Sequence, residues 1–195
     1  MKTDCSADYN SVLPLLGTTG CPFCKFLRRY QASLLKTAQP DLRHLCNYHA
    51  WALAAVQPVS SAAEIFLQLL LRAYDEARTC ICDLCQLLTY EEESRMDEFL
   101  TSAAERPAVR WIRSQRSGLC LEHGMRLEQR APTLLGTQVK AVERRYRESL
   151  IADLTYMKNN PRTETEVWNV IGQAAEFLVA QRGRCESRRM NVNSR

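Results

Sequence analysis

No apolar stretch of this sequence approaches the length of a membrane-spanning helix. The best candidate, residues 65–71, is bounded by charge on both sides, whereas a helix that crosses a bilayer needs about 20 apolar residues. The N-terminus also lacks the pattern of a secretion signal, because Asp4 and Asp8 stand where positive charge is expected and the apolar run 12–16 is too short. These absences predict a cytoplasmic protein without a membrane span.

The sequence also lacks the short motifs that carry common enzyme chemistry. It has no glycine-rich phosphate-binding loop, no nucleophile elbow and no His-Glu-x-x-His motif. Histidine is scarce, with three residues in the chain, so few side chains remain for general acid–base catalysis. The sequence therefore favours a role other than catalysis.

Cysteine, by contrast, is abundant, with nine residues in 195. An odd number of cysteines in a cytoplasmic chain argues against a disulfide framework and for metal or redox chemistry. Six of them fall in a pattern that occurs twice, in which C-x-x-C is followed by L-C-x-x-H. The first copy supplies Cys21, Cys24, Cys46 and His49, and the second supplies Cys82, Cys85, Cys120 and His123.

Each copy holds three thiols and one imidazole, which form a complete tetrahedral ligand set for structural zinc. The sequence thus predicts two zinc ions per chain, one bound by each copy, although it does not exclude ligands that pair across the copies. Four protein ligands leave no open position for a substrate, so catalytic zinc is disfavoured. Cys80 lies two residues before Cys82 and is a competing ligand, whereas His44 is expected to face away from the site.

Two other kinds of chemistry use similar residues. Thiolates of C-x-x-C motifs also bind iron–sulfur clusters, in which His can replace Cys, although the dense cysteine run of ferredoxins is missing here. The segment from Cys21 to Cys24 resembles a glutaredoxin active site, but that chemistry needs a βαβ scaffold, and no strand pattern precedes it. An iron–sulfur or dithiol redox protein is therefore the alternative interpretation.

Hydrophobic periodicity predicts an all-α fold made of duplicated helical hairpin units, each with a Cys₃His site, and a C-terminal long helical pair. In the N-terminal part, helices are expected over about 22–36, from about 41 through Cys46 and His49 to Pro58, and from a capping box at Ser61 to about 78. In the C-terminal part, helices are expected over about 82–105, over 107–118, after Gly136 to Pro161, and from a capping box at Thr163 to about 181.

The expected segments are an N-terminal extension (1–19), a first metal-binding unit (20–79), a second metal-binding unit (80–132), a helical pair (136–182) and a disordered basic tail (183–195).

The two C-terminal helices are each expected to bury one apolar stripe. The stripe of the longer helix comprises Val139, Val142, Tyr146, Leu150, Leu154 and Met157. The stripe of the last helix comprises Val167 or Trp168 with Ile171, Ala175 and Leu178. Both stripes repeat at steps of three and four residues, which is the period of an amphipathic helix.

Positive charge is concentrated in the C-terminal half of the chain. Arg106, Arg110 and Arg113 recur at helical spacing around Trp111, an arrangement that can grip phosphates and stack a base. A solvated helix face with an inward tryptophan is the simpler interpretation. Nucleic-acid binding through this half is therefore a third possibility.

These motifs together resemble an uncharacterised family of prokaryotic helical proteins, known as a domain of unknown function. The resemblance rests on the CP-x-C motif that opens a helix, on the second C-x-x-C, on both LC-x-x-H motifs, and on Glu166-Val-Trp168 followed by Gly183, and it covers about residues 20–183. It implies a cytoplasmic, helical, metal-binding protein and brings no activity with it. We therefore interpret the chain as a zinc-binding helical protein that acts as a binding or regulatory module, with an unknown protein as a possible partner.

Overall fold

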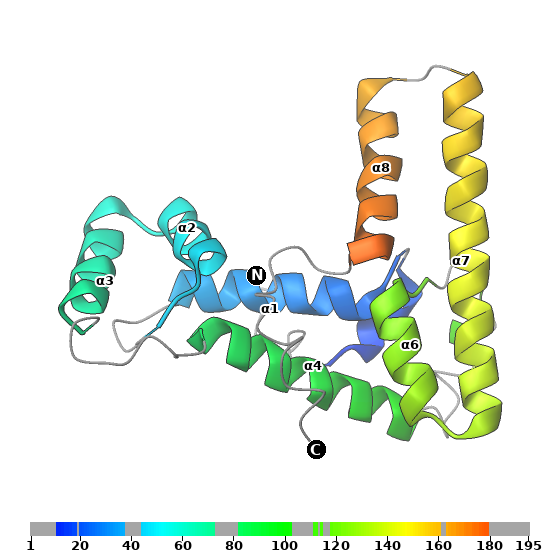
Figure 1. The fold of residues 1–195 in the computed structure, drawn as a ribbon, viewed down its shortest axis with the longest axis horizontal. Coiled ribbons are helices and arrows are strands. Elements are labelled where there is room, and N and C mark those ends of the chain that lie inside the picture. Colours follow the sequence, from blue (N-terminus) through cyan, green and yellow to red (C-terminus); the bar gives the residue numbers. More distant parts are fainter. Residues whose placement is uncertain are drawn as a thin grey trace, which may run out of the picture. The chain divides into compact units, whose positions relative to one another are not determined.

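The computed structural model describes residues 11–18, 20–37, 44–72, 82–102, 111–112, 114, 118–160 and 163–179. Every regular element in these residues is a helix, which confirms the predicted all-α fold. The elements are the 3₁₀-helix η1 (Leu13–Gly17) and the α-helices α1 (Pro22–Thr37), α2 (Asn47–Val56), α3 (Val59–Arg72), α4 (Asp83–Ser102), α6 (Leu121–Arg130), α7 (Thr133–Asn159) and α8 (Glu164–Val179). Figure 1 labels the α-helices. Within the described ranges, no helix is long and apolar enough to cross a membrane.

The chain divides into two compact units, and each is discontinuous in sequence. Unit 1 comprises Met1–Leu27 and Glu92–Arg182, and unit 2 comprises Arg28–Glu91 and Gly183–Arg195. The boundary falls inside α1 and inside α4, so each of these helices contributes to both units. This division differs from the predicted succession of segments 20–79, 80–132 and 136–182, because each unit takes residues from both metal-binding segments.

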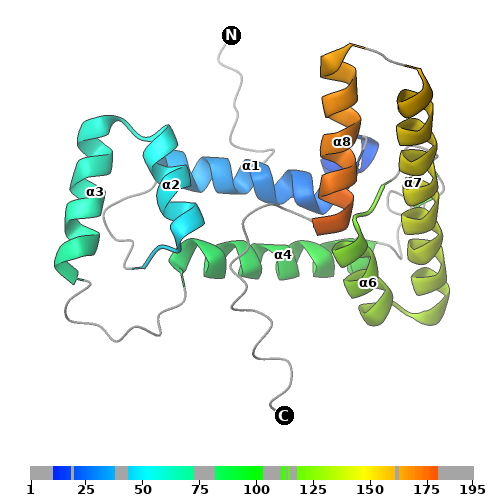
Figure 2. The same cartoon turned by 45° about the horizontal axis from the view of Figure 1, so that its top comes forward.

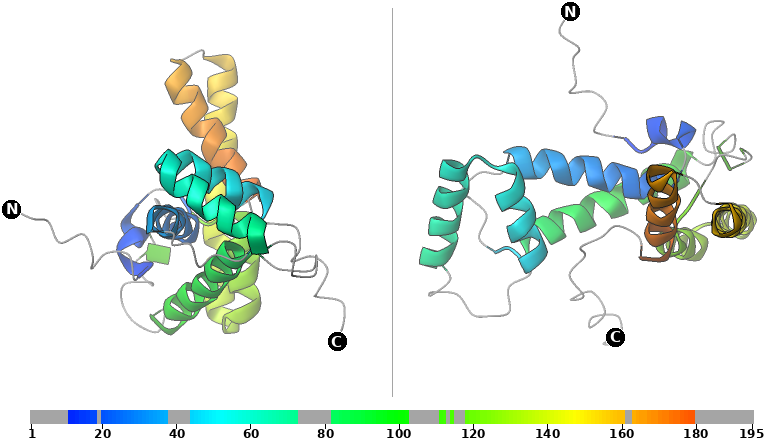
Figure 3. Two further views of the ribbon diagram at one scale, coloured as in Figure 1. Left: turned by 90° about the vertical axis from the view of Figure 1, so that its left-hand side faces the viewer. Right: turned by 90° about the horizontal axis from the view of Figure 1, so that it is seen from above.

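In unit 1, the start of α1 and the second half of α4 supply an aromatic core. The ring of Phe23 meets that of Phe99 edge to face, with centroids 5.7 Å apart, and Phe99 meets Trp111 in the same way at 5.5 Å. Helix α6 contacts α7 closely, because Gly136 has no side chain to separate them: a Cβ there would lie 3.3 Å from the carbonyl oxygen of Glu128. Helices α7 and α8 then form a hairpin, which Figure 3 shows from two further sides.

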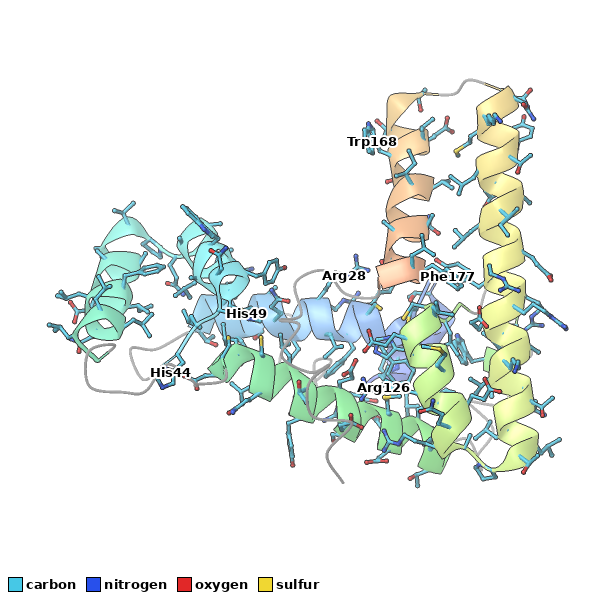
Figure 4. The ribbon with its side chains drawn as sticks, viewed as in Figure 1. Arg28, His44, His49, Arg126, Trp168 and Phe177 are labelled. Atoms are coloured by element: carbon cyan, nitrogen blue, oxygen red, sulfur yellow. The ribbon has the colours of Figure 1, made fainter. Side chains whose placement is uncertain are left out.

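The predicted apolar stripe of α7 is buried mainly in the first half of the helix. Val139, Val142 and Leu150 are buried, whereas Leu154 is 36% exposed. Of the predicted stripe of α8, Val167 and Ala175 are half-buried, whereas Trp168 and Leu178 are more than 60% exposed, so the prediction is wrong for these two residues. Trp168 points away from α7 in Figure 4.

Helix α8 is anchored instead through Phe177. This side chain is buried, and its ring meets Tyr146 of α7 edge to face with centroids 6.0 Å apart. A helix with apolar residues on more than one face offers several ways to pack, and α8 packs through a face other than the expected one.

Unit 2 has a small core. It consists of Leu35 from α1, Leu53 from α2, Ile65 from α3, and Cys82 and Leu84 at the start of α4. Helices α2 and α3 lie against each other as a short hairpin, visible in Figure 2. The other side of α3 is apolar as well, with exposed side chains at Val59, Leu67, Leu70 and Leu71.

Prolines, more than capping boxes, set the helix starts. Helix α3 begins directly after Pro58, whose carbonyl oxygen accepts the first helical hydrogen bond, so the predicted start at Ser61 is wrong. Helix α7 begins after Pro132 in the same way and not after Gly136. Proline disfavours helical backbone at the residue before it, so neither helix extends back through its proline. At α8 the predicted box does act, since the Thr163 hydroxyl accepts the Glu166 backbone N–H at 3.4 Å.

Gly118 gives a direct test of the packing in unit 1. A Cβ added there would lie 3.0 Å from the ring of Tyr146, and this ring is already held against Phe177. We expect Gly118→Ala to lower the free energy of unfolding by about 1–3 kcal/mol through overpacking, as measured by chemical denaturation. Gly172→Ala is the control, because a Cβ at this position in α8 meets nothing within 4 Å and should stabilise the helix by up to about 1 kcal/mol. Equal effects of the two substitutions would contradict this account.

Candidate metal centres

The eight predicted ligands converge into two clusters, but not in the predicted groups. Cluster 1, in unit 1, consists of Cys21, Cys24, Cys120 and His123. Cluster 2, in unit 2, consists of Cys46, His49, Cys82 and Cys85. The ligand atoms of each cluster all lie within 4.8 Å of one another. The predicted pairing within each copy is therefore wrong, since each cluster joins the C-x-x-C of one copy to the C-x-x-H of the other.

The length of α1 explains the exchange of half-sites. With 16 residues, the helix carries the chain about 24 Å from its beginning at Cys21 to its end. Helix α2 is then fixed at that far end, where Leu53 joins Leu35 in the core and the Gln57 side chain donates to the carbonyl oxygen of Lys36 at 3.2 Å. The C-x-x-H of the first copy thus stays near the start of α4 and its thiols.

The same local structure presents the ligands in both copies. Each C-x-x-C begins one residue before a helix, α1 or α4, so the positive helix end favours the thiolate form. Each C-x-x-H begins with an N-cap cysteine: φ and ψ are −73° and 161° at Cys46 and −70° and 161° at Cys120. The expectation that α2 starts near residue 41 and contains Cys46 is wrong, because residues 44–46 are not helical. Extended backbone at this cysteine turns its sulfur toward the histidine three residues later.

The distances within each cluster fit one tetrahedral ion. Zinc with bonds of about 2.3 Å to sulfur and 2.0 Å to nitrogen places two sulfurs about 3.8 Å apart and sulfur about 3.6 Å from nitrogen. In cluster 1 the Cys24 and Cys120 sulfurs are 3.6 Å apart, and Nδ1 of His123 lies 3.5 Å from Cys24 Sγ. The same Nδ1 is 3.5 Å from Cys21 Sγ and, more closely, 2.8 Å from Cys120 Sγ.

Cluster 2 has the same dimensions. The Cys46 and Cys85 sulfurs are 3.8 Å apart. Nδ1 of His49 lies 3.3 Å from Cys46 Sγ, 3.3 Å from Cys82 Sγ and 3.4 Å from Cys85 Sγ. In both clusters, then, one imidazole nitrogen faces three sulfurs across a gap the size of a single metal ion.

A buried carboxylate fixes the orientation of the cluster 1 histidine. Glu92 is fully buried, and its Oε1 lies 2.8 Å from Nε2 of His123. Its other oxygen accepts from the Arg126 guanidinium at 2.6 Å. When Nε2 donates its proton to Glu92, Nδ1 presents its lone pair to the sulfurs, which is the arrangement found around metal-bound histidines.

Glu92 was not among the residues singled out from the sequence. A signal for it exists, because the residue continues the apolar stripe of α4 that contains Leu84, Leu88 and Met96 at four-residue steps. A carboxylate in the middle of a buried stripe needs a partner. Because Glu91 and Glu93 flank it, Glu92 stands in an acidic stretch of the sequence that does not single it out.

Cluster 1 is closed to solvent on all sides described. Each of its four ligands is at most 1% exposed. The ring of Phe23 stacks on the His123 imidazole, with centroids 5.2 Å apart and planes inclined by 19°. The cluster is thus built into the aromatic core of unit 1.

Cluster 2 is more open and lacks the carboxylate. Cys46 and Cys85 are half-buried. His49 is 1% exposed, and its Nε2 has no hydrogen-bond partner in the part of the chain that the structure describes. The Tyr48 ring contacts the imidazole edge to face at 5.2 Å. Figure 4 labels His49 at the start of α2.

His44 is not a member of either cluster, as predicted. Its backbone N–H donates to the Asp83 carboxylate at 3.0 Å, and the Asp83 N–H donates to the His44 carbonyl oxygen at 3.0 Å. These two bonds hold the segment before α2 against the first turn of α4. The competing ligand Cys80 lies outside the described residues.

Crowding of the thiols drives their pKa values apart. In cluster 2, the hydrogen bond from Cys85 lowers the pKa of Cys82 to about 3, while burial raises that of Cys46. In cluster 1, burial raises the pKa of Cys21, but hydrogen bonds with Cys120 and Cys24 outweigh it and hold the pKa well below its usual value. In each cluster, therefore, at least one thiol is held toward the thiolate form, which is the form that binds metal.

Comparison of the chain with protein-family models, with curated proteins and with solved structures gave no match. The two Cys₃His clusters that the resemblance to a helical family implied are present in the structure. We therefore infer the function of the protein from the donor atoms and the geometry of these two clusters.

Glu92→Gln tests the role of the buried carboxylate. The amide keeps the shape of the side chain but removes the charge that faces His123, so we expect metal binding at cluster 1 to weaken about 10- to 100-fold. Competition with a chromophoric chelator measures this affinity. Glu93→Gln is the matched control, because Glu93 is 44% exposed and pairs only with arginines in the described structure. A similar loss of affinity in both variants would argue against a specific role for Glu92.

Proposed function

We propose that the protein binds two structural zinc ions, one in each cluster, and acts as a binding or regulatory module without enzymatic activity. The closeness of four ligand atoms in each cluster, all within 4.8 Å of one another, carries this proposal. Three thiolates and one imidazole are a donor set that zinc takes in structural sites. Four protein ligands fill the tetrahedron and leave no position for a substrate.

The spacing of the sulfurs supports a single ion over an iron–sulfur cluster. In [2Fe–2S] and [4Fe–4S] clusters, the four protein ligands are distributed over different iron atoms, so they stand farther apart than ligands of one ion. Here all four ligand atoms of each cluster lie within 4.8 Å of one another, and the closest sulfurs of the pairs Cys24–Cys120 and Cys46–Cys85 are 3.6 and 3.8 Å apart, which fits one shared ion. Dithiol exchange at Cys21 is also poorly supported, because its sulfur is buried and a thiol exchanger must reach its substrate.

The remaining parts of the proposal rest on the surface and on the state of the thiols. The six cluster cysteines are free thiols, which a reducing cytoplasm maintains. Exposed apolar side chains on α2 and α3, including Trp51 and Leu70, support a binding role, since such patches mark interaction sites. Nucleic-acid binding through Arg106, Arg110 and Arg113 stays a prediction, because these residues lie outside the described structure.

Elemental analysis of protein purified without oxygen tests the metal assignment. We expect about two zinc ions per chain and no visible absorption, because Zn²⁺ is a d¹⁰ ion. Cys185→Ala should retain both ions, since Cys185 belongs to neither motif. A brown protein that contains iron and sulfide would replace this proposal with the iron–sulfur alternative.

A further inference from the structure

We infer that cluster 2 is an exchangeable metal site, which loses and regains its ion while cluster 1 keeps its own. This inference rests on the proposed function and assigns different roles to the two zinc sites. It makes unit 2 the part of the protein that responds to the supply of free divalent zinc. Three differences between the clusters lead to it.

The first difference is the support of the histidine. In cluster 1, Nε2 of His123 is bonded to the buried carboxylate of Glu92. In cluster 2, Nε2 of His49 is buried without a hydrogen-bond partner among the described residues. A second group on the imidazole fixes its orientation and raises its basicity, and such partners contribute about 10- to 100-fold to metal affinity. The ion in cluster 2 is therefore the more weakly held.

The second difference is access to the sulfurs. A competing ligand removes a zinc ion by approaching it while the thiolates leave one by one. The sulfurs of cluster 1 belong to side chains that are at most 1% exposed, and the ring of Phe23 stacks on the His123 imidazole of the same cluster. In cluster 2, Cys46 and Cys85 are half-buried. A chelator or a small thiol can thus reach the second ion without prior unfolding.

The third difference is the core that remains when the ion leaves. Unit 1 buries many large apolar side chains, among them Phe23, Met96, Phe99, Leu119 and Leu127. Among the described residues, the buried core of unit 2 contains one apolar side chain each from α1, α2 and α3, and it includes the ligand Cys82 itself; the other apolar side chains that pack on it are only partly buried. A core of this size supplies little stability without a metal. Loss of the ion should therefore loosen α2 and α3 while unit 1 stays folded.

Binding and release of the cluster 2 ion would control the order of the apolar surface on α2 and α3. Helices α2 and α3 carry the exposed apolar side chains Trp51, Leu67 and Leu70. These side chains are held in one arrangement only while Cys46 and His49 of the same hairpin are bound to the ion. Zinc availability would thereby decide whether unit 2 presents an ordered apolar surface, with cluster 1 serving as the permanent support.

Release of zinc from the loaded, full-length protein to the chromophoric chelator 4-(2-pyridylazo)resorcinol tests the inference. We expect two phases of equal amplitude, with the faster phase about ten times as fast as the slower one or more. Cys46→Ser should abolish the fast phase and Cys120→Ser the slow phase. Wild-type protein treated with N-ethylmaleimide at the end of the fast phase should carry label on Cys46, Cys82 and Cys85 but not on Cys21, Cys24 or Cys120.

The outcomes separate the two proposals. A single phase that releases both ions, or label that reaches Cys21 and Cys24 first, would overturn the assignment of cluster 2 as the exchangeable site while leaving two zinc sites in place. Purified protein without zinc would instead overturn the proposed function. The labelling experiment uses the wild-type protein, so it shows which cluster releases its zinc first even where a cysteine variant does not fold.

Discussion

Replacing Cys21 and Cys120 together with alanine is expected to leave one zinc ion per chain, whereas replacing Cys21 and Cys46 together is expected to leave none. The first pair belongs to cluster 1 alone, and the second pair takes one ligand from each cluster. A Cys₃His site that loses one thiolate no longer has its tetrahedral set. Elemental analysis gives the number of zinc ions per chain in each purified variant, and this number shows which ligands share an ion.

Pairing within each sequence copy gives the opposite result, because Cys21 and Cys46 would then share one ion. The matched control is the double variant Cys5→Ala and Cys185→Ala, which removes two cysteines outside the motifs and should keep both ions. The retained ion in the Cys21 and Cys120 variant can be located by maleimide labelling, which should spare Cys82 and Cys85. Retention of one ion in both ligand variants would show that the clusters are not independent sites.

Complete removal of metal is expected to abolish the cooperative thermal unfolding transition. Structural zinc sites contribute an apparent free energy on the order of 10 kcal/mol each, whereas the net stability of a domain is about 5–15 kcal/mol. Four of the six thiols are buried, and in an empty cluster this burial disfavours the charged thiolate form. Circular dichroism before and after treatment with a strong zinc chelator measures the loss.

Addition of zinc to the chelated protein should restore the transition, and addition of magnesium should not. Magnesium prefers oxygen ligands in octahedral geometry, so it controls for a general effect of ionic strength. A melting curve that is unchanged by chelation would mean that the apolar core alone holds the fold and that the clusters are incidental.

The sequence was sufficient to predict the helices and the eight clustered residues, because both depend on local patterns. Pairing of the half-sites was not predictable, since it depends on where α2 packs. Leu53 of α2 shares a buried core with Leu35 of α1, and the Gln57 side chain donates to the backbone at the end of α1, so the C-x-x-H of the first copy stays at that end. Nothing in the spacing of Cys24 and Cys46 reveals which end of a helix the next element will cover.

Burial on α8 was mispredicted for a related reason. Trp168, Ile171 and Leu178 form a regular stripe, but the buried Phe177 and the half-buried Val170 lie on another apolar face of the helix. Periodicity identifies faces that are able to pack and does not rank them. The aromatic contact between Phe177 and Tyr146 selects one of them, and that contact joins residues from two different helices.

The exchange of half-sites between the copies has a consequence for how such a chain could arise. A solitary ancestral segment with one C-x-x-C and one C-x-x-H, in which a long helix separates the two, could not have closed its own ligand set. Two identical segments would have completed each other's sites as an intertwined homodimer, and fusion of the two genes would then place both sites on a single chain. On this view, neither half of the chain can be expressed alone with a bound ion, but two separately expressed halves should reassemble when mixed with zinc.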